Sequence, residues 1–95
     1  RLSHKNKSPK IYGAEYLIHL GKDRIETLSL LLKEGNVSVS RLEIKPCGQE
    51  FYTAALSFNA DSEEEIAKTE SKLREIDGAL IFEIQNDGQA AVIGD

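Results

Sequence analysis

Four segments of the chain alternate apolar with more polar residues, which is the pattern of β-strands with one buried face. They span residues 14–20, 37–44, 51–60 and 79–85. The positions assigned to the buried faces are Tyr16, Ile18 and Leu20; Val37, Val39, Leu42 and Ile44; Tyr52, Ala54, Leu56 and Phe58; and Leu80, Phe82 and Ile84. In the second segment the alternation slips between Ser40 and Arg41, which predicts a β-bulge.

An amphipathic helix is predicted between the first and second strands, because apolar residues recur there at helical spacing. These residues are Ile25, Leu28 and Leu32. Asp23 and Glu26 have the spacing of a capping box at the start of the helix. Gly35 is placed to end the helix at about Glu34.

A second helix is predicted between the third and fourth strands, with a similar apolar spacing. Its apolar face consists of Ile66, Thr69, Leu73 and Ile76. Asp61 or Ser62 caps the start, and Ser62 with Glu65 forms a second capping box. Gly78 is a suitable left-handed cap at the end.

The order of elements is therefore βαββαβ, which predicts an α+β domain of the ferredoxin-like class. The second and third strands form an antiparallel hairpin around a longer loop at Pro46–Gln49. Both helices cover one face of a four-stranded antiparallel sheet, and the other face stays open. The residues expected on the open face are Leu17, His19, Thr53, Ala55, Ser57, Ile81 and Glu83. This mixture suggests a face partly covered by another copy or by another domain.

Length and composition indicate one small globular domain, because 95 residues with 40% hydrophobic content leave no room for a second core. Residues 1–13 are interpreted as a basic leader or juxtamembrane linker and residues 14–85 as the folded domain. Residues 86–95 are a C-terminal tail or an extra edge strand, because Asp87-Gly88 is a hairpin signal followed by apolar residues. The chain begins with Arg1 rather than Met, so it reads as a piece of a longer protein.

The net charge of −4 is unevenly distributed, because the first ten residues hold four basic side chains and no acidic one. The remaining residues carry −8. An acidic body argues against nucleic acid as the partner, since phosphate binding needs a positive face. The basic leader is either a contact for a membrane surface or a solvated linker. No apolar run approaches the roughly 18 to 20 residues of a membrane span.

Candidate chemistry is sparse, and the sequence predicts neither an enzyme nor a bound metal or cofactor. Cys47 is the only cysteine, which excludes an internal disulfide and indicates a reducing compartment. Neither His4 nor His19 has a partner at the spacing of metal ligands. The turn Gly21, Lys22 and Asp23 precedes the first helix and is the one candidate for a weak ligand site.

Two short phrases carry a resemblance to the ACT family of small-molecule regulatory domains: Gly35-Asn-Val-Ser-Val39 after the first helix, and Leu73-Arg-Glu-Ile-Asp-Gly78-Ala before the last strand. The family's Asp-x-Pro-Gly signature is replaced here by Leu20-Gly-Lys-Asp-Arg24. We therefore expect no tight binding of free amino acids. We also expect no specific magnesium site, because Glu63, Glu64 and Glu65 point in different directions around a helix.

With its basic leader and its closing phrase Leu73–Glu83, the chain resembles the cytosolic C-terminal ACT-like domain of MgtC/SapB-type bacterial inner-membrane proteins. That resemblance implies a non-catalytic regulatory or protein-contact module on the cytoplasmic side of the inner membrane, in a family linked to growth under magnesium limitation. The expected partner is a second copy, bound weakly, or another protein on the open face. The alternative is an effector-binding ACT domain of a soluble metabolic enzyme.

Overall fold

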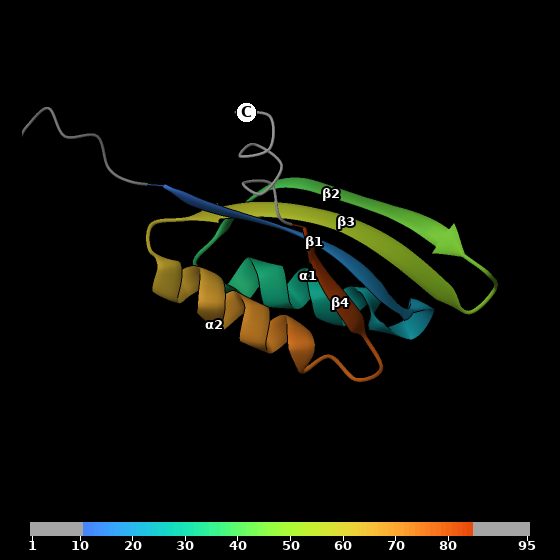
Figure 1. The fold of residues 1–95 in the computed structure, drawn as a ribbon. Helices are drawn as coiled ribbons and strands as arrows, with labels where there is room; N and C mark the ends of the chain where they lie inside the picture. The colour runs from blue at the N-terminus through green and yellow to red at the C-terminus, as the bar shows by residue number, and fades with distance from the viewer. Residues whose placement is uncertain (1–10, 85–95) are drawn as a thin grey trace, which may run out of the picture.

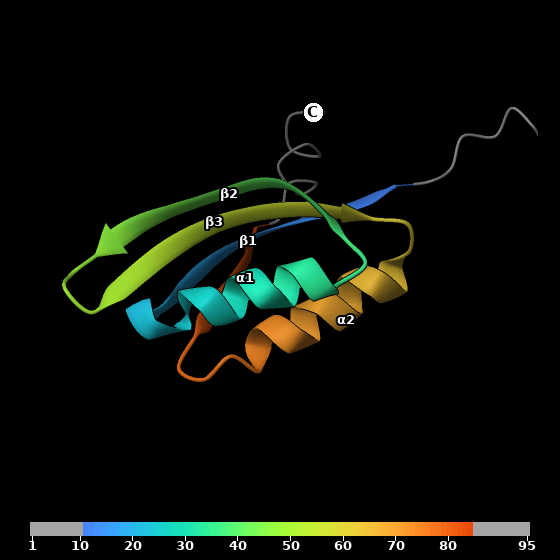
Figure 2. The ribbon, with the colours of Figure 1, turned by 180° about the vertical axis from the view of Figure 1, so that it is seen from behind.

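The computed structural model describes residues 11–84. The elements in chain order are β1 (Tyr12–Gly21), the 3-10 helix η2 (Lys22–Arg24), α1 (Ile25–Glu34), β2 (Ser38–Cys47), β3 (Phe51–Ala60), α2 (Glu63–Arg74) and β4 (Leu80–Ile84). The strands form one sheet in the order β2-β3-β1-β4, and every neighbouring pair is antiparallel. Both α-helices lie on the same side of this sheet (Figures 1 and 2). The predicted ferredoxin-like α+β arrangement is confirmed.

Two of the predicted segments fall largely or wholly outside the described residues. These are the basic leader, of which only residues 11–13 are described, and the C-terminal tail or fifth strand at 86–95. The first strand begins at Tyr12, two residues before the predicted start at residue 14, because Tyr12 and Gly13 pair with the end of β3.

The hydrophobic core lies between the sheet and the two helices. Its fully buried side chains include Tyr16, Ile18 and Leu20 from β1, Leu56 and Phe58 from β3, Leu28 from α1 and Leu73 from α2. The rings of Tyr16 and Phe58 stack with centroids 5.8 Å apart. The predicted buried faces of the first and third strands are therefore confirmed, because burial of one face is what imposes a period of two on a strand.

The predicted bulge in β2 is present. The register of β2 against β3 shifts between Val39 and Arg41, so Ser40 has no opposite residue. Val39 lies opposite Phe58 and Leu42 lies opposite Leu56, although these two β2 residues are three positions apart. The extra residue returns the apolar side chains of β2 to the helix side of the sheet.

The connection between β2 and β3 is shorter than the predicted loop. Pro46 and Cys47 belong to β2, opposite Tyr52 and Phe51, and only residues 48–50 form the turn. Proline is tolerated there because β2 is an edge strand, where one side of the backbone has no strand to bond. Gly48 has φ +80°, a left-handed conformation that favours glycine at this tight turn.

The two helices begin differently. The capping box predicted from Asp23 is wrong, because Arg24 occupies the N-cap of α1 without a side-chain bond and the 3-10 helix η2 leads into α1 instead. The cap predicted for the second helix is confirmed, since the backbone N–H of Glu65 donates to Oγ of Ser62 at 3.2 Å. The first helix ends at Glu34 as predicted.

The second helix ends at Arg74, before Gly78. Gly78 lies in the turn that follows, where its φ of +76° is the predicted left-handed conformation. The backbone N–H of Ala79 donates to the carbonyl of Ile76 at 3.1 Å and tightens the same turn. This connection sets where β4 begins.

Candidate functional site

The face of the sheet opposite the helices is the principal candidate site. Directly paired residues in antiparallel strands point to the same face, so the register assigns each position. His19 pairs with Thr53 and Leu17 pairs with Ala55. These residues, together with Ser57, alternate with the buried positions of β1 and β3, so their predicted place on the open face is confirmed.

The predicted placement of Ile81 and Glu83 on this face is wrong. Ile81 pairs with the buried Ile18, and Glu83 pairs with the buried Tyr16, so both point towards the helices. Ile81 also packs against the core. Leu80, Phe82 and Ile84, which the pattern assigns to the core, are instead on the open face opposite His19, Leu17 and Glu15. The turn after α2 sets this register, because the nearly uniform apolar sequence of β4 gives little preference for either face.

A continuous band of large apolar side chains therefore runs along β1 and β4 on the open face. We call Leu17, Leu80, Phe82 and Ile84 the apolar stripe. Their exposed fractions are 40%, 55%, 55% and 43%. Beside the stripe, His19 stacks on Phe51 of β3 with ring centroids 4.7 Å apart and an interplanar angle of 22°. Exposed apolar groups in such a contiguous arrangement usually mark a contact surface.

The other half of the open face is polar. Arg41, Glu43 and Lys45 of the edge strand β2 pair with Ser57, Ala55 and Thr53, so all three point to the open side. Arg41 donates a hydrogen bond to Oε1 of Glu43 at 3.0 Å. This hydrogen bond and the nearby positive charge lower the pKa of Glu43, and both groups are exposed. Small β3 side chains separate this charged edge from the apolar stripe.

The turn Gly21, Lys22 and Asp23 lies at one end of β1 and is largely closed by its own groups. The backbone N–H of Lys22 donates to the carbonyl of Glu50 at 3.0 Å. A Cβ on Gly21 would lie 2.8 Å from Oδ1 of Asp23, so the carboxylate is folded back over the glycine. The ammonium of Lys22 lies 5.7 Å from the ring centroid of Tyr52. These contacts leave few free polar groups in the turn for a ligand. Weak ligand binding at Gly21, Lys22 and Asp23 stays a prediction.

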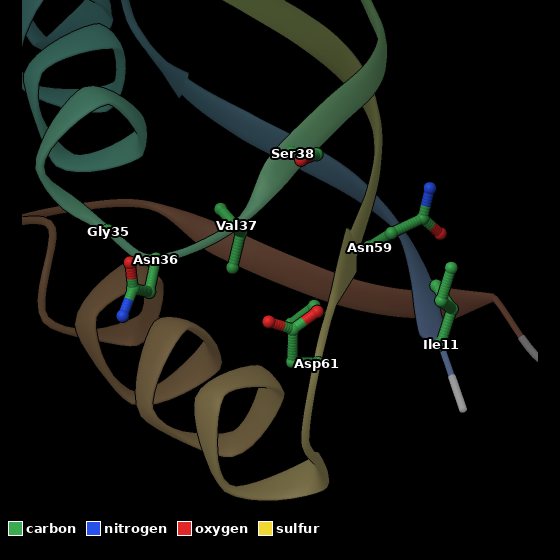
Figure 3. Close-up of a pocket in the computed structure, with 8 residues that line it drawn as sticks. Ile11, Gly35, Asn36, Val37, Ser38, Asn59 and Asp61 are labelled. Atoms are coloured by element: carbon green, nitrogen blue, oxygen red, sulfur yellow. The ribbon is translucent and has the colours of Figure 1, made fainter. Parts of the chain in front are cut away.

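A shallow polar hollow of about 390 Å³ lies at the opposite end of the sheet (Figure 3). Asn36 from the α1–β2 connection, Asn59 from β3 and Asp61 before α2 line it together with Ile11. No binding site was predicted at these residues, although Asp61 was a cap candidate and Asn36 lies in the phrase Gly35–Val39. The predicted topology could have placed these residues together, because the end of the first helix and the end of the third strand meet at one end of a ferredoxin-like sheet.

The remaining candidate side chains do not converge. Among residues 11–84, no three His, Cys, Asp or Glu side chains form a group that could hold a metal ion. Cys47 is exposed at the end of β2, whereas His19 is on β1. These two strands are separated by β3, whose Phe51 stacks on His19. Glu63 and Glu64 face outward in the first turn of α2. In the same described part of the chain, no helix is long and apolar enough to cross a membrane.

Comparison with solved structures defines the class of fold. The crystal structure of the ACT domain from GTP pyrophosphokinase of Chlorobium tepidum superposes with a TM-score of 0.70, at 10% identity over 79% of this chain and 100% of that chain. The solution structure of the same domain gives 0.64, also at 10% identity, over 79% and 88%. The chain therefore has the ACT-like, ferredoxin-like α+β fold.

The fold alone does not specify a function. The de novo designed protein Foldit4 also superposes, with a TM-score of 0.53 and 18% identity over 80% of this chain and 98% of that chain. No protein-family model matches the sequence, and no curated protein matches it. The function must therefore be argued from the surface of this domain.

Proposed function

We propose that the chain is a non-catalytic regulatory domain that acts through protein contact at the open face of its sheet. The observation that carries this proposal is the apolar stripe on the sheet face that, within residues 11–84, neither helix covers. Isolated exposed aliphatic residues are common on protein surfaces, but here four large side chains are adjacent on two paired strands. A partner that covers the stripe would remove it from water and couple the domain to that partner.

The parent protein is proposed to be a bacterial inner-membrane protein of the MgtC/SapB type, with this chain as its cytosolic C-terminal domain. Two features support this placement. The first ten residues hold four basic side chains, as expected for a segment on the cytoplasmic side of a membrane helix. The closing phrase Leu73–Glu83, together with this leader, carries the resemblance to that family. The domain would then regulate a protein linked to growth under magnesium limitation.

A second candidate is an effector-binding ACT domain of a soluble metabolic enzyme. It is favoured by the structural likeness to the ACT domain of a GTP pyrophosphokinase. The effector would bind near Gly21, Lys22 and Asp23. The turn geometry argues against this candidate, because Asp23 and the carbonyl of Glu50 already occupy the groups that an effector would use.

The two candidates are separated by the residues that precede Arg1 in the parent protein and by its location in the cell. We expect apolar helical spans upstream and recovery of the parent protein in the membrane fraction. In cells that depend on the parent protein, Leu80→Lys should impair growth at low magnesium, whereas Leu30→Lys on the opposite side should not. An upstream catalytic domain, with micromolar amino-acid binding localised by NMR to residues 21–23, would establish the second candidate instead.

A further inference from the structure

We propose that the apolar stripe binds the stripe of a second copy of this chain, so that two sheets pack face to face around a two-fold axis. The inference rests on the proposed contact function and names the partner of that surface. It follows from three observations on the open face: the area of the stripe, its position relative to the charged residues, and its shape. The helices cover the other face and are not involved (Figures 1 and 2).

The area of the stripe suits a weak symmetric contact. If a fully exposed large side chain presents about 200 Å², the exposed fractions of the stripe correspond to roughly 400 Å² on one copy. Phe51, with 41% exposed, extends the same apolar surface beside His19. Two copies would bury about 800 Å² of this apolar surface together with neighbouring polar atoms, which is below the limit of about 1,200 Å² for stable interfaces and in the range of weak, transient ones. A dissociation constant in the micromolar to submillimolar range is therefore expected.

The charges of the open face favour a copy of the same chain. The six open-face residues in the paired region of β1 and β4 include one formally charged residue, Glu15, which is half-exposed and pairs with Ile84 at the end of the stripe. The charged side chains of β2 lie on the opposite edge of the sheet. A two-fold axis along the strands, between β1 and β4, places β1 of each copy over β4 of the other. Both β2 strands then stay outside the contact as a polar rim, the arrangement that stable interfaces have.

The shape of the stripe fits sheet-on-sheet packing. Facing sheets pack about 10 Å apart with interdigitating side chains. Leu17 and Phe82 are paired neighbours of different size at the middle of the stripe. The two-fold axis brings the larger side chain of one copy over the smaller one of the other, and the same contact occurs twice. Such an isologous contact closes at two copies.

The test measures association of the full chain by sedimentation, from about 10 μM to about 1 mM, a range chosen for the weak interface expected from its area. Leu80→Lys and Leu30→Lys are a matched pair, because both leucines are 55% exposed but lie on opposite faces of the domain. We expect the unaltered chain to form reversible dimers. Leu80→Lys should raise the dissociation constant at least about tenfold, whereas Leu30→Lys should leave it unchanged within about twofold. Circular dichroism of each variant confirms that the fold is retained.

A second measurement maps the contact in the unaltered chain. On dilution, NMR signals of the stripe and of the His19 ring should shift, while those of α1 and α2 should not. A strict monomer over the whole concentration range overturns the proposal, as does an equal effect of Leu30→Lys. The proposal would also be overturned if the full chain stayed monomeric while a chain ending at Ile84 formed dimers. That result would identify residues 85–95 as the occupant of the stripe. A monomer whose Leu80→Lys variant still impairs growth rejects the second copy but retains the proposed function.

Discussion

The hydroxyl of Tyr16, at the centre of the sheet, donates a hydrogen bond to Oε1 of Glu70 on α2 at 3.0 Å. Oε2 of the same carboxylate accepts a hydrogen bond from Nε of Arg74 at 2.9 Å. The phenol ring is buried against Phe58, while its oxygen reaches the polar side of the helix. Burial, the hydrogen bond to Glu70 and the negative charges of Glu70 and Glu83 raise the pKa of Tyr16.

The raised pKa of Tyr16 predicts an alkaline loss of stability. Above the ordinary tyrosine pKa of about 10, the unfolded chain releases this proton while the folded chain retains it. The unfolded state is then favoured, so the free energy of unfolding should fall as pH rises from 9 to 11. Urea denaturation at the two pH values measures the fall, which should be smaller in Tyr16→Phe. An equal fall in both proteins would show that Tyr16 does not contribute to it. At neutral pH, Tyr16→Phe should cost about 1 to 2 kcal/mol.

Adjacent substitutions in β4 test which face each residue occupies. Ile81→Asp should destabilise the domain by about 1 to 3 kcal/mol, because it places a charge against the core beside Ile18. Phe82→Asp should cost less, since Phe82 is 55% exposed on the open face. Thermal unfolding at low protein concentration compares the two variants without association. The reverse order of stability would mean that β4 is shifted by one residue against β1.

The cap of α2 should make a measurable contribution to stability. Ser62→Ala removes the acceptor of the Glu65 N–H bond and should cost about 1 kcal/mol. Ser71→Ala is the matched control, because Ser71 is exposed in the interior of the same helix, where alanine is the better helix former. Chemical denaturation of both variants should show a loss for the first and no loss for the second. Equal stabilities would contradict the capping role.

Two glycines that follow helices should respond differently to alanine. Gly78→Ala should destabilise by about 1 to 2 kcal/mol, because φ is +76° and an L side chain is strained there. Gly35→Ala should be neutral or slightly stabilising, since φ is −80° and the added Cβ would meet its nearest atom at an ordinary 3.5 Å. Thermal melting of the two variants tests this difference. A larger loss at Gly35 would contradict it.

Local sequence pattern was sufficient wherever one face of an element is buried and the other is polar or small. In β3, Ala54, Leu56 and Phe58 are buried and alternate with partly exposed residues, and the strand has its predicted limits. The bulge in β2 was also readable, because the slip of the apolar alternation is its direct consequence. The buried face predicted for β2 is wrong in part, since Val39 and Ile44 are exposed on this edge strand. The cap at Ser62 depends only on residues within one helical turn. The predicted βαββαβ order follows from such elements.

Tertiary structure alone decided which residues of β4 belong to the candidate contact surface, whereas Leu17 of β1 was predicted there from the sequence. In β4, large apolar side chains stand at four of five positions, so Glu83 alone made the alternation favour Phe82 over Ile81 as the buried residue, and that assignment is wrong. The turn at Gly78 and the pairing with β1 fix the register of β4. This register places Glu83 on the helix side and the β4 residues of the apolar stripe on the open face. The start of α1 was decided in the same way, because Asp23 folds back over Gly21 rather than capping the helix. A strand's own sequence specifies its period of two, but only its partner and its connection specify its phase.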